Sequence, residues 1–150
     1  MRPFDSLTLM QFCWAFLSIV GFSIRSNLRG LKVIFAGLGG GLAWAFYLIT
    51  LFYSRSLLFS IFVSTILVCV YSEFIARRFK VPVSVFVICA IIPLVPGSGL
   101  YYSMQSYLAG NLGEASVKIV TTLMIAGTIA VGIAVVSSVT NLVTRVLNRF

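Results

Sequence analysis

The sequence predicts an all-α membrane protein in one domain, a bundle of about five transmembrane helices of which the fourth is broken at Pro93–Gly99. Composition is the first observation, because only 9% of the 150 residues are charged, against about 25% in soluble domains. The second is a series of apolar runs near the roughly 20 residues that cross a bilayer. The third is a cluster of prolines and glycines inside one run, where a regular helix cannot continue.

Five apolar segments separated by short polar turns are predicted to span the membrane and pack antiparallel. They cover residues 6–24, 33–53, 57–72, 81–104 and 117–143. Pro82 suits the first turn of the fourth segment, and Asn111 with Glu114 resembles a capping box that opens the fifth. The first segment could imitate a signal peptide, but it lacks a small-residue cleavage site before a polar chain and is predicted to be retained.

Basic residues predict the orientation of the spans. Eight lie on one predicted side: Arg25, Arg29, Lys32, Arg77, Arg78, Lys80, Arg145 and Arg149. Three lie on the other: Arg2, Arg55 and Lys118. Because Lys and Arg favour the cytoplasmic side, a multi-pass protein of the cell (inner) membrane is expected, with its N-terminus outside and its C-terminus in the cytoplasm. The net charge of +8 comes from basic residues at the ends of apolar segments, where they orient the spans and contact anionic lipid. Nucleic acid is therefore not an expected partner.

The break in the fourth segment is the predicted substrate site. Pro93 lies about 17 Å along the helix from its start, near the midplane of a hydrocarbon core about 30 Å thick. Gly97 and Gly99 can take positive φ and let a ligand approach the backbone, and Ser98 could cap a second half-helix over 100–104. Its free N–H groups would suit a carboxylate. The predicted substrate-binding residues are Pro93, Pro96, Gly97, Ser98, Gly99 and Tyr101.

The alternative is a packing helix that is merely kinked by its two prolines, with Tyr101 and Tyr102 in an interfacial aromatic belt. Small residues one turn apart predict close helix packing at two other places. These pairs are Gly37 with Gly41 in the second span, and Ala126 with Ala130 in the fifth. The glycine-rich run is not a nucleotide loop, because neither a strand nor a Lys-Ser/Thr pair accompanies it.

Ionisable groups are too scarce for an enzyme, a metal site or a cofactor site to be expected, since the chain has no His and three acids. Glu73 precedes Arg77 by four residues, which favours an ion pair on one helix face; the alternative is a role in proton coupling. Glu114 is interpreted as a helix cap, or else as a substrate gate. Weaker polar candidates are Asp5, Ser137, Ser138 and Thr140. Free thiols are predicted for Cys13, Cys69 and Cys89.

The segment from Pro82 to Met104, PVSVFVICAIIPLVPGSGLYYSM, resembles the signature of the threonine/serine exporter family. Its specific part is Pro93-x-x-Pro96-Gly97, followed by Tyr101 and Met104. The chain is similar to short members of the family, which correspond to the C-terminal membrane half of the longer exporters. The resemblance implies a hetero-oligomeric inner-membrane exporter with a larger membrane subunit of the same family. It implies a small carboxylate as substrate, such as threonine, serine or succinate.

The leading hypothesis is therefore a subunit of a secondary transporter that exports small carboxylates; import would use the same parts. A homo-oligomer is also expected, because five spans leave little room to enclose a pathway. The alternatives are a non-transporting structural or assembly subunit of a larger membrane complex and a small channel, with a membrane enzyme a distant third.

Overall fold

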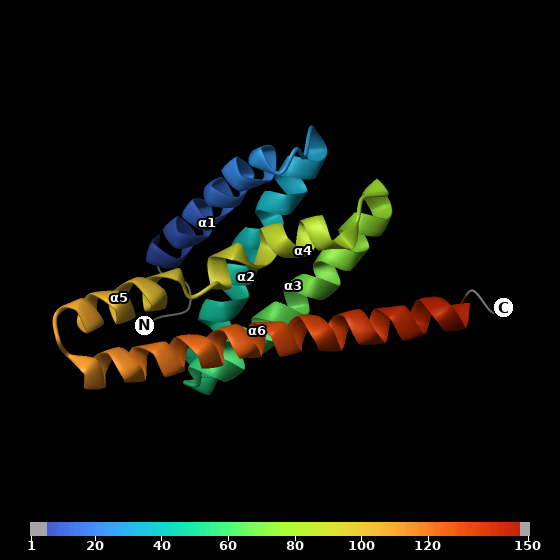
Figure 1. Ribbon diagram of the computed structural model, residues 1–150. Coiled ribbons are helices and arrows are strands. Elements are labelled where there is room, and N and C mark those ends of the chain that lie inside the picture. Colours follow the sequence, from blue (N-terminus) through green and yellow to red (C-terminus); the bar gives the residue numbers. More distant parts are fainter. Residues whose placement is uncertain (1–5, 148–150) are drawn as a thin grey trace.

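The computed structural model describes residues 6–147, and side-chain surroundings for residues 8–143 (Figure 1). Every regular element in this range is helical: α1 (Ser6–Arg25), α2 (Leu31–Ser54), α3 (Leu57–Phe79), α4 (Val83–Ile91), the 3-10 turn η1 (Ile92–Leu94), α5 (Gly97–Leu108) and α6 (Leu112–Leu147). Within the described residues, four helices are long and apolar enough to cross a bilayer, and the bent pair 83–94 and 97–108 makes a fifth if it counts as one span. The predicted fold class is confirmed.

Local chemistry explains where the helices end. Arg55 and Lys80 both take a left-handed conformation with φ 51°, and their N–H groups bond to carbonyls of the last helical turn. These bonds satisfy acceptors that a helix C-terminus would otherwise leave open. Gly110, with φ 82°, makes the tight turn between α5 and α6. Pro82 lies at the N-cap of α4, one residue before the position that the sequence indicated.

Three helices run at least four residues further than the apolar segments that predicted them. Helix α3 continues to Phe79, α5 continues to Leu108, and α6 begins at Leu112 directly after Asn111. Hydropathy marks the part of a helix that suits hydrocarbon, whereas backbone hydrogen bonding continues into the polar interface. The start of α6, with Glu114 in its first turn, agrees with the boundary that the capping pattern indicated.

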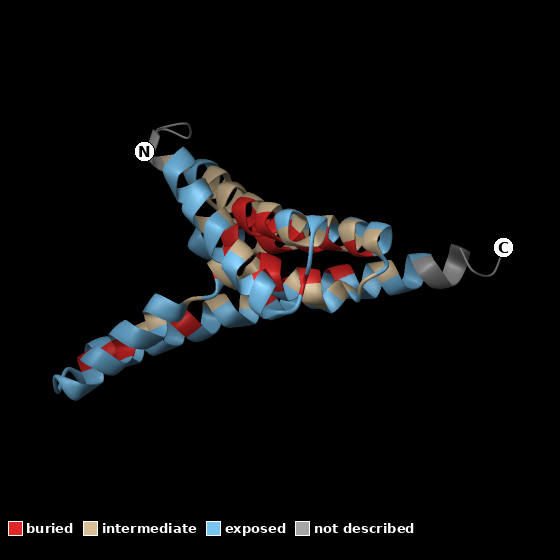
Figure 2. Cartoon of the chain, turned by 90° about the horizontal axis from the view of Figure 1, so that it is seen from above, coloured by how far each residue is buried: buried red, intermediate tan, exposed pale blue. Residues whose placement is uncertain are grey.

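The first four helices form the body of the molecule, and α5 with the N-terminal part of α6 projects from it as a two-helix arm (Figures 1 and 2). One buried apolar cluster joins α1 to α4: Ile19, Leu28, Ala36, Ala76, Phe86 and Cys89. A second joins α2, α3, α4 and η1 to the middle of α6: Ala43, Ile61, Val68, Ala90, Leu94 and Ile129. Buried residues are sparse along the arm in Figure 2.

The glycine face of α2 lies directly against α1. A methyl group added at Gly37 would come within 2.9 Å of the Phe16 ring, and one at Gly41 within 2.7 Å of the Phe12 ring. Such distances are too short for real carbon contacts, so the two helices can approach this closely only because side chains are missing. The other face of α2, through Gly39, meets α3 and α4.

Helix α3 carries a buried stripe of mostly small residues that was not among the predicted packing faces. Every fourth residue of this helix is buried: Ser60, Ser64, Val68, Ser72 and Ala76. The Ser64 hydroxyl donates a 2.6 Å hydrogen bond to the carbonyl of Ala43 on α2. Small residues and interhelical hydroxyl bonds are usual glue between membrane helices, so the four-residue spacing was a readable signal.

The predicted alanine face of α6 requires a correction. Ala126 and Ala130 are exposed, so they do not form the packing contact within the described chain. Helix α6 instead meets α3 through Gly132, where an added methyl group would lie 2.9 Å from a Thr65 methyl carbon. Small residues can be found in the sequence, but α6 has them on more than one face. The sequence does not show which of these faces contacts a neighbouring helix.

Candidate functional site

The polypeptide changes direction between α4 and α5, where the sequence placed its break. Helix α4 ends at Ile91, one 3-10 turn follows, and Val95 is extended, with φ −64° and ψ 128°. The axes on the two sides of the break differ by 49°. Proline removes one backbone donor and clashes with the preceding turn, so Pro93 and Pro96 account for the loss of regular α-helix.

Backbone hydrogen bonds define what the break offers to a ligand. The N–H of Gly97 donates to the Val95 carbonyl at 2.8 Å, around Pro96 with φ −78° and ψ 57°. This is an inverse γ-turn. Leu100 then donates to the Pro96 carbonyl at 3.4 Å. The N–H groups of Ser98 and Gly99 lie before that bond, in the first turn of α5, where amides have no helical acceptor and the helix end is partly positive.

Three details of the predicted site are corrected. Gly97 and Gly99 are helical, and the glycines with positive φ in the described chain are Gly30 and Gly110. Ser98 is inside the first turn, because Pro96 occupies the N-cap. Helix α5 has 12 residues in place of the short half-helix over 100–104. The prolines and the 3-10 turn make the bend, so no left-handed residue is needed there.

The two helical glycines of α5 have different surroundings. An added methyl group at Gly97 would meet nothing within 4 Å, whereas at Gly99 it would collide with the Thr122 hydroxyl of α6. Ser98 and Tyr101 are exposed, and Pro93 and Pro96 are half-buried. Gly99 therefore lets α5 pack on α6, while Gly97 and Ser98 present an open surface that this chain does not enclose.

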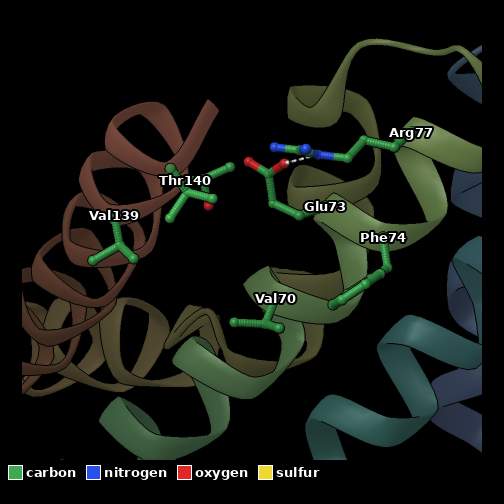
Figure 3. A pocket seen from close by; sticks show the side chains of 7 residues that line it. Val70, Glu73, Phe74, Arg77, Val139 and Thr140 are labelled. Carbon is green, nitrogen blue, oxygen red and sulfur yellow. Dashed lines mark hydrogen bonds and ion pairs between the residues drawn. The ribbon is translucent and has the colours of Figure 1, made fainter. Parts of the chain in front are cut away.

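A second polar feature lies between α3 and α6 (Figure 3). A groove of about 290 Å³ is lined by Val70, Glu73, Phe74, Arg77, Val139, Thr140 and Val143. The Glu73 carboxylate points toward α6 in Figure 3, and its side chain is only 17% exposed. Arg77, which is 52% exposed, places its Nε 3.4 Å from the Glu73 Oε2. The predicted ion pair is confirmed.

The α6 wall of this groove could not be predicted from the sequence. Thr140 was a weak candidate on its own, and nothing local connects it with an acid 67 residues earlier. Asp5, another weak candidate, lies outside the described residues.

Glu114, the second acid among the residues that the structure describes, makes its contacts in the arm. Glu114 Oε1 lies 2.7 Å from the Lys118 Nζ, which also donates to the Ser106 hydroxyl of α5 at 2.9 Å. This contact ties α6 to α5, and Glu114 lies in the first turn of α6, where a carboxylate is favourable.

Comparison with known proteins decides the family. The sequence profile described as threonine/serine exporter, ThrE, matches residues 11–139, which is most of the chain. The chain belongs to the threonine/serine exporter family. Neither a curated protein nor a solved structure matches it. The family is one of transporters, so this exporter-family chain is a multi-pass membrane protein of the transporter type. The matched range contains the whole break and Glu73.

Proposed function

We propose that the chain is a subunit of a secondary transporter that exports small carboxylates, with threonine and serine as the first substrates and dicarboxylates such as succinate as the second. The observation that carries this proposal is the broken span inside the family match, with its first-turn amides open at the surface. Broken backbone at membrane depth is tolerated only beside protein or a wet cavity. Transporters use such helix ends to hold anionic groups.

In this proposal the substrate carboxylate binds at the N-terminus of α5. Pro93 and Pro96 fix the bend, and the open Gly97 gives access to the amides of Ser98 and Gly99. The exposed Ser98 hydroxyl and Tyr101 ring flank that access. Backbone donors can hold an anion without a charged side chain, which suits a chain with few charges.

A second chain is part of the proposal. Gly97 and Ser98 are exposed, and broken backbone there cannot face lipid tails, so a second protein that covers it or encloses a wet cavity beside it is part of the proposed assembly. We assign that role to a larger membrane subunit of the same family, with a second copy of this chain as the alternative. The exposed Ala126 and Ala130 offer a close-packing face for such a partner.

We also propose that the N-terminus is outside the cell and that the C-terminus is cytoplasmic. The α1–α2 and α3–α4 turns lie on the same side of the molecule (Figure 1). These turns and the helix ends beside them carry six of the eight basic residues that set this orientation: Arg25, Arg29, Lys32, Arg77, Arg78 and Lys80. Arg2, Arg149 and the Arg145 side chain lie outside the described residues.

Reconstitution tests the proposed function. The chain alone, the larger subunit alone and both together are placed in liposomes, and uptake of labelled threonine and labelled succinate is measured. We expect saturable flux that requires this chain. Equal flux from the larger subunit alone would reject the proposal in favour of an assembly role, and large unitary currents would reject it in favour of a channel.

Glu73 is the proposed proton-coupling residue. Among the described residues it is the acid that lies inside a span and faces a groove, and intramembrane carboxylates often serve proton pathways. At a threonine concentration that saturates the variant, the flux of Glu73→Gln is expected to be insensitive to an imposed pH gradient, because the amide cannot exchange a proton. Glu114→Gln, which removes the acid of the other i,i+4 ion pair, should keep the response. A gradient response unchanged in the Glu73 variant would contradict this role.

A further inference from the structure

We infer that the groove between α3 and α6 is a binding site for a small zwitterion that carries a primary ammonium and a carboxylate on one carbon. No part of the break contributes to it, since its walls are Val70, Glu73, Phe74, Arg77, Val139, Thr140 and Val143. Its biological role rests on the proposed export function, but the binding itself is measured without transport.

The charges of the groove match both ends of an amino acid. Glu73 supplies a carboxylate for the ammonium, and Arg77, one turn further along the same face, supplies a guanidinium for the carboxylate (Figure 3). The planar guanidinium is the side chain best suited to hold a carboxylate through two parallel bonds. Both groups project from the same face of one helix, so both can reach a single small ligand.

The contact between the Arg77 Nε and the Glu73 Oε2 is long. Its Nε–Oε2 distance is 3.4 Å, whereas charge-assisted bonds of this type are about 2.7–2.9 Å. The Glu114–Lys118 pair, with the same i,i+4 spacing, reaches 2.7 Å. A zwitterion that enters between Glu73 and Arg77 leaves neither charge without a counter-charge, so the exchange avoids the penalty for an isolated charge at a poorly solvated position.

The same logic excludes the other substrate class from this groove. A dicarboxylate could pair with Arg77, but its second carboxylate would meet Glu73, which is 83% covered and therefore poorly screened by water. Like charges juxtaposed in such a site cost several kcal/mol, on the order of 100-fold or more in affinity. The groove thus discriminates amino acids from dicarboxylates, a choice that backbone amides at the break do not make.

Size and position fit an exported amino acid. The volume of about 290 Å³ lies just below the roughly 300–1,000 Å³ of drug-sized pockets, so it suits a smaller solute. The valines give an apolar wall, and Thr140 places a hydroxyl-bearing side chain on the α6 side. Glu73 lies six residues before the end of α3, roughly 9 Å along the axis. That end carries Arg78 and Lys80 and is the proposed cytoplasmic side, from which an exporter takes its substrate.

Binding of labelled L-threonine to the purified chain in phosphatidylcholine nanodiscs tests the inference. Glu73→Gln should weaken binding about 30-fold or more, since breaking a poorly solvated charge pair costs at least 2 kcal/mol. Glu114→Gln, the matched control, should stay within about twofold because that pair is exposed. Serine should compete with threonine, and succinate should not.

A second variant does not touch the charges. Val139→Phe enlarges an exposed side chain on the α6 wall and should block threonine binding while the protein elutes as a single species in gel filtration. Threonine binding unchanged in both Glu73→Gln and Val139→Phe, or equal competition by succinate, would overturn the inference.

A lipid headgroup offers the same chemistry, because phosphatidylethanolamine also joins an ammonium to an anion. Native mass spectrometry of the purified chain separates the two sources. Phosphatidylethanolamine that is retained by the wild type and lost from Glu73→Gln, with no threonine binding, would overturn the solute site. Threonine binding without any flux in the reconstituted complex would refute the proposed transport function and leave the groove intact.

Discussion

Gly97→Val is expected to reduce threonine flux to below about a tenth of the wild-type rate, because a hydrogen bond to a charged group is worth about 1.5–3 kcal/mol. Within the described chain an added methyl group at Gly97 meets nothing within 4 Å, so the fold should tolerate the larger side chain. In the transporter the same side chain would cover the first-turn amides of α5. Flux is measured in proteoliposomes, with the amount of inserted protein determined in parallel.

Two further variants make this experiment decisive. Gly113→Val is the matched control, since Gly113 is also an exposed first-turn glycine with open space around it, and its flux should be unchanged. Gly99→Val should lower stability and flux together, because its side chain would collide with Thr122. Wild-type flux in Gly97→Val would exclude the break as the substrate site.

Gly40→Val is expected to have the largest effect on folding. A methyl group at Gly40 would overlap the side chain of Ile19, which is fully buried where α1 crosses α2. Overpacking of this kind costs about 1–3 kcal/mol. The apparent melting temperature in detergent should therefore fall, as measured by the loss of the monodisperse peak in gel filtration after heating.

Gly21→Val on α1 is the control for that substitution. Gly21 is exposed and has open space around it, so the melting temperature should stay close to that of the wild type. A Gly40 variant as stable as the Gly21 variant would mean that α1 does not pack on α2 as described.

The break could be predicted because its cause is local. Pro93 and Pro96 lack an N–H wherever they stand, so a helix through them must deviate. The conformation of Gly97 and Gly99 could not be predicted in the same way, because glycine permits positive φ without requiring it. What matters at both positions is that glycine has no side chain. At Gly99 this is required because Thr122, a residue of another helix, fills the space that a side chain would need.

The groove was beyond prediction for a different reason. The pair of Glu73 and Arg77 follows from a four-residue spacing, but its surroundings depend on α6 crossing α3. The exposure of Ala126 and the burial of the stripe on α3 also depend on which helices pack against each other. Small residues show that a close contact exists, and only the fold shows with which helix it is made.

Helix α6 has a mechanical consequence for the whole molecule. It is one uninterrupted rod, and the distance along it from Thr122, beside Gly99, to Thr140, in the groove, is roughly 27 Å. A helix of this kind does not shorten, so sliding or tilting it shifts both contact points at once. A shift of α6 along its axis would therefore move its contacts at the break and in the groove together, although the two places share no residue.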